Sequence, residues 1–104
     1  MITLEQLQGQ EIFINSMKLE RVDGQLILSM NMNFKDETCG LTFYNVSSFS
    51  VKSLSYPLQI CGFEVIDNLS NGWQKALRYQ VHDFEEGSIY FYCESLEISE
   101  YSVF

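Results

Sequence analysis

The sequence predicts an all-β fold, an antiparallel sandwich or a partly open barrel of about seven or eight strands, with a short N-terminal helix. The first observation behind this prediction is that, from Ile12 onward, short segments rich in β-branched and aromatic residues are separated by turn signals. The second is that several of these segments alternate apolar with polar residues, which is the period of a half-buried strand.

The helix is expected at the very start of the chain. Thr3 can cap it, because Gln6 occupies the capping-box position three residues later, ahead of Leu7. One or two turns fit before the strand pattern begins.

The clearest strand is expected from Gln25 to Lys35. Asp23-Gly24 before it is a strong hairpin signal, because both central residues of a type I′ turn need positive φ. This turn should join the strand to one covering roughly Ile12 to Val22. The apolar face of the Gln25–Lys35 strand consists of residues at every second position: Leu26, Leu28, Met30, Met32 and Phe34.

The other strands are expected where apolar residues recur at alternate positions, around Cys39–Phe43, Phe49–Val51, Cys61–Val65, Leu77–Val81 and Ile89–Cys93. The final strand is expected to start at Ser88 and to continue past Cys93, where Leu96 and Ile98 have the opposite parity to Phe91. A bulge or bend near Glu94-Ser95 is therefore needed to keep both sets of side chains inward.

A single domain should cover residues 1–104. The chain has 104 residues, of which 46% are hydrophobic, which is enough for one core and too little for two. Its single proline leaves no segment with linker composition.

The charge is strongly acidic, with six basic and fourteen acidic residues and a net charge of -8. Such a field repels phosphate backbones and anionic lipid, so neither nucleic acid nor a membrane is an expected partner. The start of the chain lacks the pattern of a secretory signal, and the three cysteines are an odd number without a Cys-x-x-Cys pair. We expect a cytoplasmic protein in which Cys39, Cys61 and Cys93 are reduced core residues.

An interaction face is predicted in the C-terminal half. Tyr90 and Tyr92 should point away from the apolar face that Ile89, Phe91 and Cys93 form. They would then make an aromatic stripe that either a second layer or a partner covers. Trp73 could anchor a partner or close one end of the core. The acidic residues Asp83, Glu85, Glu86 and Glu94 could bind a basic protein, or could form a solvated hairpin tip and a charged surface.

No catalytic residue, metal site or cofactor is predicted. His82 is the single histidine, which excludes a multi-histidine metal site, and no nucleophile motif accompanies it. The segment from Asp67 to Gly72 matches an EF-hand loop at two positions, but Leu69 and Arg78 stand where ligands are needed. We therefore expect a non-enzyme without a cofactor.

The leading hypothesis is a noncatalytic interaction domain that binds a basic protein partner. The alternative is a β domain that binds a small ligand in an apolar pocket lined by Leu26, Leu28, Met30, Met32 and Phe34, because methionines adapt to irregular ligands. An exposed strand edge could also support a homodimer.

Three segments carry a resemblance to known proteins. Leu41–Val46, Tyr56–Val65 and Arg78–Gly87 resemble small acidic all-β proteins of Bacillus-type bacteria, a family of unknown function. In size, charge and β pattern the chain is also similar to small acidic immunity proteins that block bacterial toxins. The resemblance implies a protein-binding role without assigning any site residue.

Overall fold

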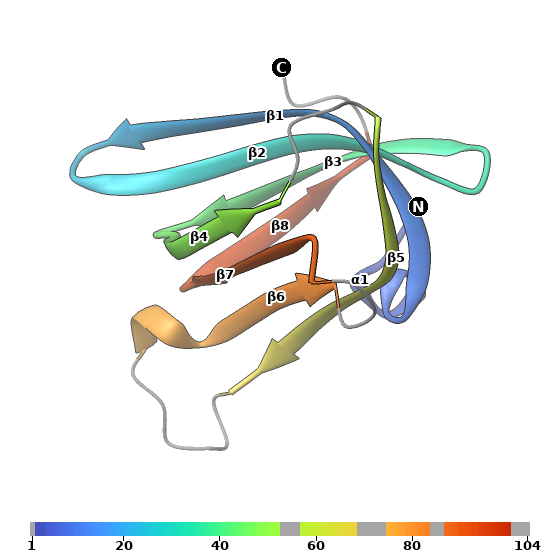
Figure 1. Cartoon of the computed structure of the whole chain (residues 1–104). Helices are drawn as coiled ribbons and strands as arrows, with labels where there is room; N and C mark the ends of the chain where they lie inside the picture. The colour runs from blue at the N-terminus through green and yellow to red at the C-terminus, as the bar shows by residue number, and fades with distance from the viewer. Residues whose placement is uncertain (1, 53–56, 69–74, 84–86, 101–104) are drawn as a thin grey trace.

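The computed structural model describes residues 2–52, 57–68, 75–83 and 87–100 (Figure 1). It confirms the all-β prediction and the short helix at the start. The elements are α1 (Leu4–Leu7), β1 (Gln10–Val22), β2 (Gln25–Phe34), β3 (Glu37–Tyr44), β4 (Ser47–Val51), β5 (Leu58–Asp67), the 3₁₀ helix η2 (Lys75–Leu77), β6 (Tyr79–Asp83), β7 (Ile89–Cys93) and β8 (Ser95–Ser99).

The eight strands of the described residues form one antiparallel sheet in the order β4-β7-β6-β5-β1-β2-β3-β8. The strands at the two ends of this order are β4 and β8, and each directly follows an interior strand in the sequence: β4 follows β3, and β8 follows β7. Tyr44 pairs with Ser95 and, beyond a short break, Ser47 pairs with Tyr92, so both pairings belong to one ladder. The ends of the sheet therefore meet, and the sheet curls around one core (Figure 1).

The core lies inside this curl. Phe43 and Phe91 come from strands on the two sides of the meeting point, and their rings pack edge to face with centroids 4.9 Å apart. The expected apolar face of β2 is confirmed, since Leu28, Met30 and Met32 are fully buried. Most of the predicted alternation thus points into one shared interior.

The β1–β2 hairpin has the predicted turn. Asp23 and Gly24 have φ values of 51° and 80°, the left-handed conformations that a type I′ turn requires. The register shifts between Ile14 and Ser16, where an irregularity bends β1. The hairpin extends well past the neighbouring strands (Figure 1).

The predicted bend near Glu94-Ser95 is also confirmed. β7 ends at Cys93 and β8 begins at Ser95, while Asn45, in the break between β3 and β4, has a φ of 54°. The Glu94 amide donates to the Tyr44 carbonyl at 3.0 Å, so the bend between β7 and β8 lies beside the break between β3 and β4. Leu96 consequently packs against the core despite its parity.

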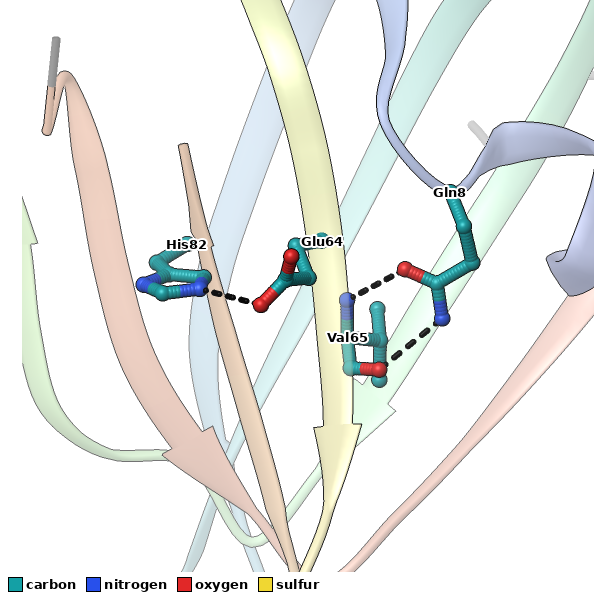
Figure 2. Close-up of polar contacts among 4 residues, drawn as sticks. All are labelled: Gln8, Glu64, Val65 and His82. Atoms are coloured by element: carbon teal, nitrogen blue, oxygen red, sulfur yellow. Dashed lines mark hydrogen bonds and ion pairs between the residues drawn. The ribbon is translucent and has the colours of Figure 1, made fainter. Parts of the chain in front are cut away.

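The N-terminal helix is tied to β5 by a side chain. Gln8 follows α1, and its amide accepts from the Val65 N–H and donates to the Val65 carbonyl, both at 2.9 Å (Figure 2). Thr3 and Gln6 form the predicted capping box, and Leu7 is fully buried. Within the described ranges, no helix has the length and apolar character required to cross a bilayer.

Candidate interaction face

Cross-strand pairing places three polar side chains in one row on the outer surface of the sheet. Glu64 of β5 lies opposite His82 of β6, which lies opposite Tyr90 of β7. Their sequence neighbours Val65 and Val81 are buried. Because successive strand residues point to opposite faces, the row faces outward.

An ion pair or hydrogen bond fixes the first two members of the row. The Nε2 atom of His82 lies 3.1 Å from Oε1 of Glu64, with side-chain exposures of 19% and 37% (Figure 2). The imidazole also meets the Tyr90 ring edge to face, with centroids 6.0 Å apart. His82 is therefore held on both sides, by a carboxylate and by an aromatic ring.

The two tyrosines form the other half of the cluster. The hydroxyl oxygens of Tyr90 and Tyr92 are 2.9 Å apart, and the rings meet at 82° with centroids 5.6 Å apart. The bond to Tyr92, with a contribution from burial, raises the pKa of Tyr90 above its ordinary value. We call Glu64, His82, Tyr90 and Tyr92 the tyrosine face.

The tyrosine face has no second sheet over it among the described residues, because all eight strands belong to the same sheet. Both tyrosines are half-buried. Pre-positioned aromatic rings with polar hydroxyl ends are suited to binding a protein surface, because little side-chain entropy remains to be lost.

Glu94 lies two residues after Tyr92, at the bend, and its carboxylate is already engaged. Oε1 accepts from the side-chain amide of Asn45 at 3.2 Å, and Oε2 lies 3.6 Å from the ammonium of Lys75. The side chain remains 33% exposed. Glu94 therefore stabilises the bend and also adds a partly neutralised charge near the tyrosine face.

A tyrosine–carboxylate contact between β3 and β8 continues this outer surface. The Tyr44 hydroxyl donates to Glu97, and this bond is the main cause of the raised pKa of Tyr44. Tyr44 was not predicted as a site residue, and the residue pattern gave no signal for it because its contact spans 53 residues of sequence.

The structure places Asp83 differently from the other predicted residues. It is 2% exposed and lies opposite the buried Phe63. The expected position of Asp83 on an acidic surface therefore does not fit, because the alternation that turns His82 outward turns Asp83 inward. Trp73, Glu85 and Glu86 lie outside the described residues.

Four of the five side chains proposed to line a ligand pocket fill the core instead, whereas the fifth, Phe34, borders a hollow. Leu28, Met30 and Met32 have no exposed surface, and Leu26 packs against the core.

Two hollows lie near the N-terminal segment. One, of about 360 Å³, is lined by Ile2, Glu37, Thr38, Cys39 and Glu100; the other, of about 430 Å³, is lined by Ile2, Gln6, Phe34, Lys35, Asp36 and Glu37.

Within the described part of the chain, no three histidine, cysteine or acidic side chains come together as metal ligands. Comparison of the chain with protein-family models, with curated proteins and with solved structures finds no match.

Proposed function

We propose that this protein is a noncatalytic interaction domain that binds a basic protein partner through the tyrosine face. The observation that carries the proposal is the outward Tyr90–Tyr92 pair, joined at its hydroxyls and framed by His82 and Glu64. Tyrosine is among the residue types that contribute most to binding energy at protein interfaces.

Charge supports a basic partner. The chain carries a net charge of -8, and residues 53–104 hold eight acidic against two basic residues. Glu64 lies within the tyrosine face and Glu94 at its end, each with part of its side chain exposed. A complementary positive surface would be attracted over a distance of about one Debye length, roughly 8 Å at physiological salt.

From the resemblance to acidic immunity proteins in size, charge and β pattern, we propose one class of partner, a basic bacterial toxin that such a domain would inhibit. In that case the hydroxyls of Tyr90 and Tyr92 would bond to the toxin surface and the carboxylates would pair with its lysines or arginines.

The test is quantitative capture of partners from the native host by the immobilised protein, read by mass spectrometry. The face variant Tyr90→Ala/Tyr92→Ala is compared with the wild type, and the captured protein is then purified for affinity measurement. Loss of the aromatic pair is expected to weaken binding by roughly tenfold or more.

A charge-matched pair of variants separates local contacts from the overall field. Glu64→Gln/Glu94→Gln and Glu5→Gln/Glu37→Gln remove the same number of acidic groups, but the second pair lies on α1 and at the start of β3. The first pair should weaken binding more and reduce its salt dependence. Equal affinities for wild type, face variant and both charge variants would refute the proposal.

A further inference from the structure

Among the described residues, the half of β1 that follows Ile14 has a strand on one side, β2, and none on the other. β1 pairs with β2 along nearly its whole length, from Phe13 to Val22, but with β5 only from Gln10 to Ile14. Pro57 immediately precedes β5 and has no N–H to continue that ladder. The hairpin therefore projects with an open edge along β1 (Figure 1).

The register determines which backbone groups this edge presents. The two-residue turn makes Val22 and Gln25 a hydrogen-bonded pair, and such pairs alternate along an antiparallel ladder. The backbone N–H and C=O groups of Ser16, Lys18, Glu20 and Val22 thus bond to β2. The N–H and C=O groups of Met17, Leu19 and Arg21 consequently point away from β2, toward a potential partner strand.

The same segment carries exposed apolar surface. The large hydrophobic side chains that are exposed in the described residues all belong to β1: Phe13 at 36%, Leu19 at 43% and Val22 at 41%. Leu19 lies opposite Leu28, which is fully buried, so its exposure arises because the hairpin projects past the core and not because it faces outward. An open strand edge bearing apolar side chains is a template for strand addition.

The charges along this edge are complementary to those of a second copy. In an antiparallel pairing centred on Leu19, Lys18 of each copy lies opposite Glu20 of the other. Leu19 would pair with its own counterpart, and all three outward donors of each copy would be used. Lys18 and Glu20 are 54% and 45% exposed, and their contact within one chain is 3.7 Å. An exposed lysine often prevents edge pairing, but here a glutamate would face it.

We infer that β1 is a self-association edge, through which two copies of this chain pair antiparallel about a two-fold axis at Leu19. The edge lies on the projecting hairpin, whereas the tyrosine face lies on β5, β6 and β7. The inference is therefore independent of the proposed binding of a basic protein.

The test is sedimentation equilibrium across a roughly hundredfold range of protein concentration. The samples are the wild type, Lys18→Glu, Glu20→Lys, an equimolar mixture of these two variants, and the double variant Lys18→Glu/Glu20→Lys. Each single substitution places like charges opposite one another at two symmetric positions and should raise the dimer dissociation constant roughly tenfold. The mixture and the double variant should both regain the wild-type association, because each restores opposite charges across the axis.

Far-UV circular dichroism checks that the variants keep the fold, which is expected since both side chains are exposed. Leu19→Pro adds a backbone test, because it removes an outward N–H without touching the ladder to β2. A wild type that stays monomeric at every concentration would overturn the inference. So would a dimer that the single charge variants leave unchanged, or whose loss in them is not reversed by mixing.

Discussion

At the scale of single residues, the three cysteines have different surroundings although their sequence contexts look alike. Cys93 is fully buried, and burial raises the pKa of its thiol to about 12. Burial also raises the pKa of Cys39, with a smaller contribution from the charge of Glu37. Cys61 is half-buried, so the prediction that it is a core residue on the face of Phe63 and Val65 is wrong: the register shifts between Cys61 and Phe63, where Gly62 has a φ of 97°. Because the thiolate is the reactive form, the inner two should be inert in the native state.

We expect one fast-reacting thiol when the native protein is treated with a water-soluble disulfide reagent at about pH 8. Cys61→Ser should abolish the fast phase, while Cys93→Ala should leave it intact. Peptide mapping after a short exposure identifies the labelled residue. Label found on Cys93 in the fast phase would contradict the burial of the Cys93 thiol.

At the scale of elements, the Gln8 side chain acts as a short piece of strand. It supplies one acceptor and one donor to the backbone of Val65, as a neighbouring strand would (Figure 2). This contact joins α1 to β5 across 57 residues of sequence. Without it, two backbone groups of a half-buried strand would lose their partners.

Gln8→Ala is expected to lower the free energy of unfolding by about 1–2 kcal/mol, because two hydrogen bonds to a partly buried backbone are lost. Gln8→Glu should also destabilise the protein, since a carboxylate accepts from the Val65 N–H but cannot donate to the Val65 carbonyl. Urea denaturation measures both, with the exposed Gln10→Ala as the control. A Gln8→Ala midpoint equal to that of Gln10→Ala would show that the contact contributes nothing.

At the scale of the whole molecule, several groups resist ionisation in the folded state. Cys39, Cys93, Tyr44 and Tyr90 all have raised pKa values. A raised folded pKa means that the unfolded chain releases its proton first as the pH rises. Their contribution to stability is therefore complete below the unfolded pKa values and is lost progressively above them.

We expect the free energy of unfolding to fall as the pH rises above about 9. Cys93 alone should account for a loss on the order of 2 kcal/mol by about pH 10, given an unfolded thiol pKa near 8.5. Urea midpoints at a series of pH values measure the slope. Cys93→Ala starts from lower stability because it leaves a cavity, but its slope should be shallower than that of the wild type. Equal slopes would contradict the assignment to Cys93.

The sequence by itself determined the local features of this protein. Period-two alternation identified the strands and the inner face of β2, the Asp23-Gly24 pair identified the hairpin, and the parity of Leu96 required the bend at Glu94. These features follow from φ preferences and from the direction of successive side chains, which depend on near neighbours in the chain. The same alternation places Asp83 on the inner face, opposite in direction to His82.

Only the tertiary structure decided which strands lie side by side. Nothing local to Glu64 reveals that His82 stands opposite it, because strand pairing depends on the registers and loop closures of the whole sheet. Equally, the open edge of β1 exists because β5 stops pairing at Ile14, a fact about two segments more than 40 residues apart. The sequence lists the residues of the tyrosine face and of the β1 edge, but it does not show which of them lie together. That grouping depends on the long-range pairing that curls the sheet around its core.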